Sequence, residues 1–327
     1  MKTQLFNPAI RLAALTSLVM VAAALVLENS FISTAVAEDK IVITSVTGLS
    51  LGACDEKSSK DSCTSKSGKC KSYGTLMQWS CGNSFSGGPS RNEPLVTDRP
   101  DFTEASSTVG VGVTQFELGY KYTNDDASDT IGNSYPELLV RYGIFAEWLE
   151  LRVAWNYATE ETARVAISGS EDLYLGMKIA LTPQEGVLPE MALIPQMTVS
   201  TGAPAFAAGE TLPGLNWVYG WEVNDAWSTA GSTQLNRALD EATGDAYTEF
   251  AQSWTIGCAL SDRIGGYAEW FAFFPHSADT AAIEHYFNGG FVVLLSDDVQ
   301  WDVFAGRGIN DAADDYFVGT GLSIRLR

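Results

Sequence analysis

The chain has 327 residues, of which 46% are apolar, and a formal net charge of -20. A nucleic-acid partner held by phosphate contacts needs clustered Lys and Arg, so this acidity excludes one. The charge is also uneven, since residues 38–91 hold seven Lys and Arg against five acids, and residues 92–327 hold eleven against 34. We therefore divide the chain into two regions of different chemistry that meet near Pro89–Pro94.

Residues 1–37 have the pattern of a secretory signal peptide. Lys2 and Arg11 supply a positive flank, residues 12–27 form an uncharged apolar run, and Ala35-Val36-Ala37 offers small residues for cleavage. A retained membrane anchor is the alternative, because the apolar run is only slightly shorter than a helical membrane span. Cleavage predicts export, after which no further segment is apolar enough for a transmembrane helix.

Residues 38–94 form a Cys-, Ser- and Lys-rich N-terminal segment, which we expect to be poorly ordered or stapled by disulfides. Its four cysteines are Cys54, Cys63, Cys70 and Cys81. Export to an oxidising compartment favours two disulfides, and the three possible pairings stay open. A zinc site is a weaker reading, since Cys-x-x-Cys pairs and nearby His are absent from the segment. A lipoprotein cleavage site at 51–54 is a third possibility. Cys258 lies far away and is interpreted as a packed, inert thiol.

From Thr114 onward apolar and polar side chains alternate, most clearly in 115–122, 147–157 and 172–181. Period two predicts β-strands with one apolar and one charged face. We predict twelve strands, at 114–123, 134–143, 147–158, 171–181, 190–202, 214–223, 227–236, 247–260, 264–274, 283–295, 299–307 and 315–326.

The predicted connectors alternate between short and long. Turns such as 145–146, 224–226, 261–263 and 296–298 are short, whereas polar loops such as 159–170 are long. Short turns on one rim and long loops on the other are typical of an all-β, antiparallel up-and-down transmembrane β-barrel, which we place at 95–327. A soluble β-sandwich would also alternate apolar and polar residues. It would turn the apolar faces inward, and a Greek-key order should not keep the alternation of connectors.

The charged strand faces supply the candidate lumen residues. These are Glu117, Lys121, Glu137, Arg141, Glu150, Arg152, Asp172, Lys178, Asp302 and Arg307. They could form a charged constriction that selects permeants by sign and shape, or simply neutralise one another inside the barrel. Four more charged residues, Asp98, Arg99, Asp101 and Glu104, precede the first strand. They either enter the lumen as a plug or cap the periplasmic rim.

Catalysis has little support in the sequence. The chain has two histidines, His276 and His285, and the neighbouring Ser277 and Glu284 form no nucleophile-elbow pattern. Acidic loop residues could bind divalent cations, although a solvated acidic surface is the simpler reading. We therefore expect no enzyme, no catalytic residue, no metal and no cofactor.

Several segments resemble a known family of outer-membrane β-barrels. The motif Thr97-Asp98-Arg99-Pro100-Asp101-Phe102-Thr103-Glu104 carries the resemblance, together with 136–143, 150–152, 306–311 and 314–319. The family is that of the MetA pathway of phenol degradation, and the resemblance covers about 95–327. It implies an outer-membrane barrel that passes small molecules, aromatic ones among them. The chain departs from the usual aromatic C-terminus of such barrels by ending in Arg325-Leu326-Arg327.

These observations predict a protein of the cell outer membrane, surrounded by lipid, that lets small hydrophobic or aromatic solutes cross passively through a charge-lined lumen. The alternative is a structural or surface-interaction barrel with a blocked lumen and no transport. The sequence leaves the permeant and the oligomeric state open.

Overall fold

The computed structural model describes residues 76, 92–240 and 242–327. The predicted signal peptide and the cysteines Cys54, Cys63, Cys70 and Cys81 lie outside the described residues. No helix within the described part of the chain is long and apolar enough to span a bilayer.

The described residues form thirteen β-strands in one antiparallel sheet. The strands are β1 (Thr114–Asp125), β2 (Thr130–Gly143), β3 (Leu149–Thr162), β4 (Val165–Ser170), β5 (Leu173–Thr182), β6 (Glu190–Val199), β7 (Leu212–Asn224), β8 (Trp227–Leu239), β9 (Ala246–Ser261), β10 (Ile264–His276), β11 (Glu284–Ser296), β12 (Val299–Gly308) and β13 (Tyr316–Leu326).

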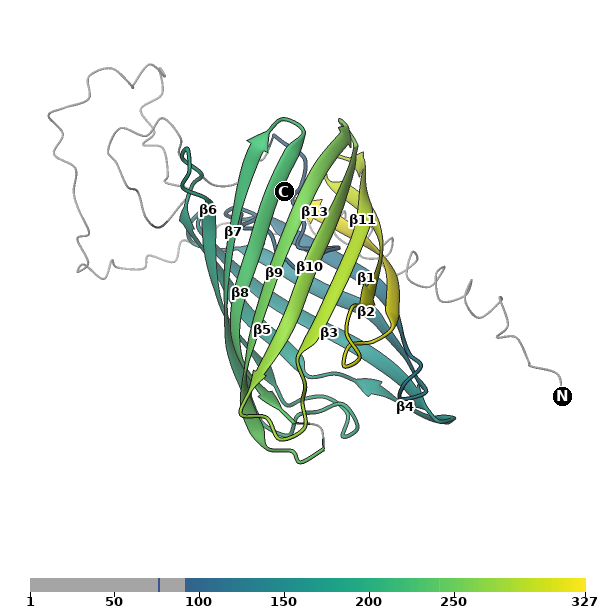
Figure 1. The fold of residues 1–327 in the computed structure, drawn as a ribbon. Helices are drawn as coiled ribbons and strands as arrows, with labels where there is room; N and C mark the ends of the chain where they lie inside the picture. The colour runs from purple at the N-terminus through teal and green to yellow at the C-terminus, as the bar shows by residue number, and fades with distance from the viewer. Residues whose placement is uncertain (1–75, 77–91, 241) are drawn as a thin grey trace, which may run out of the picture. The chain divides into compact units, whose positions relative to one another are not determined.

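Twelve of these strands close into a barrel (Figure 1). Neighbours in sequence pair with one another, and β1 pairs with β13 from Thr114↔Leu326 to Asn124↔Tyr316. This pairing leaves no open sheet edge around the barrel wall, as a sheet in lipid requires. The up-and-down barrel predicted from the sequence is therefore confirmed.

The thirteenth strand, β4, corrects one predicted element. Residues 159–170 were expected to form a loop, but β3 continues to Thr162 and β4 pairs with its outer end as a hairpin. The barrel wall skips β4, because the inner part of β3 pairs with β5 instead. β4 has six residues, and Val165 and Ile167 are its larger apolar side chains, so its alternation is too short to reveal a strand.

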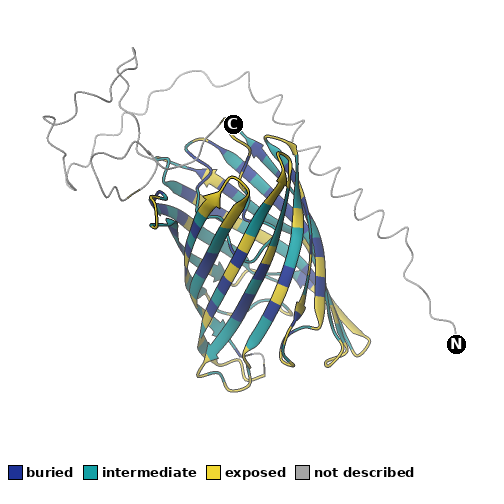
Figure 2. Ribbon diagram, turned by 45° about the horizontal axis from the view of Figure 1, so that its top comes forward, coloured by how far each residue is buried: buried dark blue, intermediate teal, exposed yellow. Residues whose placement is uncertain are grey.

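The apolar faces of the strands point away from the barrel interior. On β3, Leu151, Val153 and Trp155 are 36%, 40% and 39% exposed, whereas the adjacent Glu150 and Arg152 are 0% and 2% exposed. Exposed and buried residues alternate in this way along the strands of the wall (Figure 2). A soluble sandwich would show the reverse, so that alternative is wrong. The exterior is apolar and the charges lie inside.

Candidate functional site

Residues 95–113, here called the inner segment, lie inside the barrel. Asp98 contacts Arg141 on β2, while the backbone N–H of Phe102 donates to Glu269 on β10. Gln300 on β12 donates to Thr97, and Asn216 on β7 donates to Glu104. These strands stand on different sides of the barrel. A segment bonded to all of them crosses the lumen.

Asp98 is the centre of the first anchor of the inner segment, and it is 6% exposed. Its Oδ1 accepts a hydrogen bond from Lys178 Nζ at 2.7 Å, and its Oδ2 pairs with Arg152 and, at 3.3 Å, with Arg141. Burial alone would raise the pKa of Asp98. The three cations outweigh it and hold the pKa well below its ordinary value.

The strand carboxylates complete this charge cluster. Arg141 donates through Nε and a terminal nitrogen to both oxygens of Glu150, at 2.8 and 3.0 Å, and through the other terminal nitrogen to Glu117 at 3.1 Å. Glu117 also accepts the backbone N–H groups of Asp98 and Arg99. The strand charges therefore neutralise one another and bind the inner segment at the same time. Removing one partner would leave a buried charge uncompensated.

Glu269 forms the second anchor, on the side of the barrel away from β2. Its carboxylate accepts the backbone N–H groups of Phe102 and Thr103, both at 2.7 Å, and the Thr103 hydroxyl at 2.7 Å. Asn288 on β11 donates to the same carboxylate at 2.8 Å. This arrangement fixes two consecutive peptide groups of the inner segment.

Arg99 reaches the wall between the two anchors. It donates to Glu137 at 2.8 Å and lies 3.5 Å from Asp302, with its guanidinium 5.8 Å from the centre of the Phe304 ring. Gly119 and Gly321 make room for it, because a Cβ at either position would collide with the guanidinium. The space for the Arg99 side chain therefore depends on glycines in β1 and β13.

An aromatic cluster covers one wall of the lumen. Phe102 of the inner segment stacks on Phe271 with ring centroids 4.7 Å apart, and Phe271 stacks on Tyr286 at 4.8 Å. Phe304 and Phe317 join the same cluster. These residues were not predicted from the sequence, because charged side chains alone marked the inward faces of the strands there. Their register relative to Glu269, Asn288 and Asp302 would have placed them inward.

A cavity of about 500 Å³ separates the inner segment from the long-loop rim. Its aromatic wall comes from the cluster just described. Its polar wall contains Arg99, Asp101, Glu104, Lys121, Glu137, Arg152, Glu171 and Asp172. The cavity therefore presents flat apolar rings opposite charges of both signs.

Two of the predicted lumen residues have different surroundings from those expected. Arg307 does not point into the lumen: it is exposed and lies an odd number of residues from the inward-facing Asp302, so the strand period turns it outward. Asp172 lies just before β5 at the rim. It accepts the backbone N–H groups of Thr201, Gly202 and Ala208, and so holds a long loop.

We expect docking of the inner segment to weaken as the pH rises. Burial and the neighbouring Glu269 raise the pKa of Asp101 well above its ordinary value, and burial also raises that of Glu104 although Arg152 opposes it. An acid whose pKa is raised by docking favours the docked state at low pH, and this advantage is lost above its ordinary pKa of about 4. Asp98 has a lowered pKa, so its contribution to docking does not change with pH above the ordinary pKa of about 4.

Hydrogen exchange measures this dependence when each rate is divided by its intrinsic rate at the same pH. Protection of 95–113 should fall from pH 5 to pH 8, less so in Asp101→Asn, and hardly at all in Asp101→Asn/Glu104→Gln. Equal slopes in the wild type and the double variant would contradict the assignment to these two acids.

No group of three or more His, Cys, Asp or Glu positioned to hold a metal occurs among the residues that the structure describes. The acids inside the barrel are instead engaged by Arg, Lys and backbone N–H groups. The interior therefore presents paired charges and aromatic rings.

A family with the description "Putative MetA-pathway of phenol degradation" matches residues 97–326. The chain belongs to this family. The match begins at the inner segment and runs through all thirteen strands, so the family pattern includes the lumen contents as well as the wall. A search of curated proteins finds no match.

A solved outer-membrane channel has the same fold. An outer membrane channel from Pseudomonas putida F1 superposes with a TM-score of 0.56 at 13% identity, over 70% of this chain and 99% of that one. The NanC porin gives a TM-score of 0.44 at 10% identity, over 65% of this chain and 100% of the porin. The KdgM porin gives a TM-score of 0.42 at 9% identity, over 65% of this chain and 99% of the porin. The protein is an outer-membrane β-barrel.

Proposed function

We propose that this family member is a passive outer-membrane channel for small aromatic solutes. The observation that carries the proposal is the cavity between the inner segment and the long loops. Rings of Phe102, Phe271 and Phe317 line one side of it, and a benzene ring can pack against them, edge to face in the case of Phe271, which already stacks on Phe102 and Tyr286. Lys121 on the other side can bind a hydroxyl or carboxylate substituent.

In this proposal the inner segment blocks the lumen. It occupies the half of the barrel nearest the short turns, since its partners Glu117, Arg141 and Glu150 lie near that end of their strands. A solute that enters from the long-loop side reaches the cavity first. It then needs a displacement of the inner segment to pass further, with diffusion down the gradient as the driving force.

Liposome swelling tests the proposal with the full-length protein. Swelling in iso-osmotic 4-hydroxybenzoate should be faster than in a sugar of similar size, after subtraction of protein-free vesicles. Phe271→Ala should reduce this preference by up to about tenfold, the factor that corresponds to loss of an aromatic pair worth about 0.5–1.5 kcal/mol. Phe291→Ala, on the outward face, is the matched control and should leave the preference unchanged.

The second candidate function is a structural or surface-interaction barrel with a closed lumen. The bonds from the inner segment to strands all around the barrel favour it. Absence of flux for every solute, both in the wild type and in variants whose inner segment is released, would support this function and overturn the channel.

A further inference from the structure

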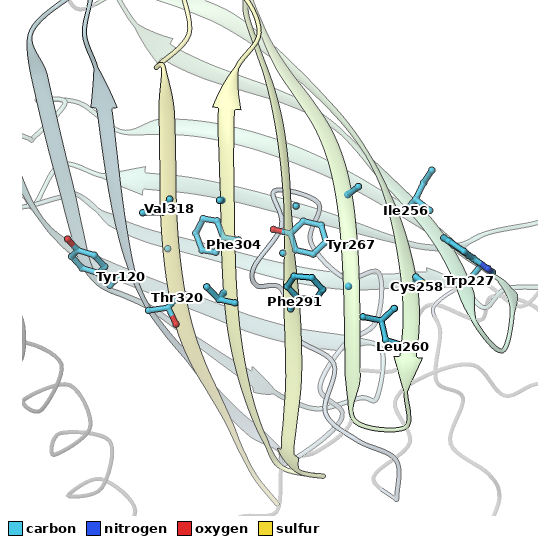
Figure 3. Close-up of a pocket in the computed structure, with 17 residues that line it drawn as sticks. Tyr120, Trp227, Ile256, Cys258, Leu260, Tyr267, Phe291, Phe304, Val318 and Thr320 are labelled. Carbon is cyan, nitrogen blue, oxygen red and sulfur yellow. The ribbon is translucent and has the colours of Figure 1, made fainter.

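The outer wall of the barrel contains an apolar groove, separate from the cavity in the lumen. It has a volume of about 1000 Å³ and lies across β9 to β13, with Tyr120 of β1 at one end and Trp227 of β8 at the other (Figure 3). Ile256, Phe291 and Val318 are 48%, 53% and 42% exposed along it. Cys258 also lines the groove, so this predicted packed thiol borders the outer surface.

The groove is hollow because three adjacent strands carry almost no side chain at the same level. Ala268 on β10 pairs with Gly289 on β11, which pairs with Ala305 on β12. Ile256 and Val318 flank this row on β9 and β13. In the next row Gly266 leaves a second gap beside Phe291. Larger residues therefore surround a floor that consists of glycine hydrogens and alanine methyl groups.

Arg307 stands at the long-loop end of this groove. It follows Ala305 by two residues on the same outward face, a separation of about 7 Å along the strand. Its Nε donates to the carbonyl of Gly308, and no described carboxylate forms an ion pair with it. Phe287 is its cross-strand neighbour, and Trp270 pairs with Phe287 in the same row.

This position identifies the level of Arg307 in the membrane. An arginine on the lipid face costs about 2–4 kcal/mol at the bilayer midplane and about 0–1 kcal/mol near the interface. Aromatic side chains gather at that interface, as Phe287 and Trp270 do in the row of Arg307. The long loops of outer-membrane barrels are extracellular, so this is the outer-leaflet interface.

We propose that the groove binds one anionic lipid of the outer leaflet. Its acyl chain lies over Ala268, Gly289 and Ala305, and its phosphate pairs with Arg307. The positive charge of Arg307 favours a headgroup that carries a phosphate and no positive charge of its own. The floor of Ala268, Gly289 and Ala305 accommodates the acyl chain. The lipid would fill the outer wall beside the strands that carry the inner aromatic cluster.

Native mass spectrometry of the full-length protein in detergent tests this with added phosphatidylglycerol and phosphatidylcholine. The wild type should retain phosphatidylglycerol in preference. Arg307→Gln should weaken that preference by about fivefold, the factor expected for one interfacial cation, without changing phosphatidylcholine binding. Arg263→Gln removes an exposed arginine at the opposite rim and is the matched control.

Ala268→Leu/Ala305→Leu fills the floor with side chains that suit a lipid-facing wall, so the barrel should fold normally. It should reduce the binding of both lipids by a similar factor. Unchanged lipid retention in Arg307→Gln and in the double leucine variant would overturn the proposal. Loss of a dimer in the leucine variant, with lipid retention intact, would also overturn it by showing that a second copy occupies the groove.

Discussion

Asp98→Ala should release the first anchor of the inner segment and open the lumen. The change leaves Arg141, Arg152 and Lys178 packed together without the carboxylate that all three contact. Removing one partner from a buried ion pair costs about 3–5 kcal/mol. The cost falls on the docked state, because a released segment leaves room for water around these cations. Release therefore becomes the favourable response.

Hydrogen exchange reports the release directly. Protection of 95–113 should fall by at least about a hundredfold, the ratio that corresponds to about 3 kcal/mol. Protection of the barrel strands should persist, and liposome swelling should rise in the same variant. Asp225→Ala, in the short turn after β7, removes an exposed acid and is the control. Retained protection in Asp98→Ala would mean that Asp98 does not hold the segment.

Much of the barrel could be predicted because membrane strands repeat a simple period. Glu150 and Arg152 alternate with Leu149 and Leu151, and this contrast gave both the strand and its inward face. The strand β10 was harder, since 270–274 is apolar on both faces. Its inward Phe271 packs against other rings, and the segment itself shows no contrast between a charged and an apolar face, so only counting from Glu269 places Phe271 inward.

The partners inside the lumen could not be predicted in the same way. The sequence singled out Asp98 and left open whether it entered the lumen or capped the rim. The answer depends on Lys178, 80 residues away, and on Arg141 and Arg152 converging on one point. Such convergence follows from barrel closure and register, which a single strand pattern does not contain. Arg307 illustrates the converse, because counting from Asp302 along β12 was sufficient to place it outside.

The largest release is expected from Asp98→Ala/Glu269→Leu, which removes both anchors. Glu269→Leu alone leaves the N–H groups of Phe102 and Thr103 without their acceptor, and each buried group left unpaired costs about 1–3 kcal/mol. Glu269→Gln should have a smaller effect, because one carbonyl oxygen remains and the repulsion with Asp101 disappears.

The two anchors act on one continuous segment, so their effects should not add. Once Asp98→Ala has freed the first part, water reaches Phe102 and Thr103 more easily and the second loss costs less. A double-variant cycle measured by exchange of 95–113 should therefore show less loss of protection than the sum of the single variants. Swelling in 4-hydroxybenzoate should be fastest in the double variant. Strict additivity would mean that the segment docks as two independent halves, each closing its own part of the lumen.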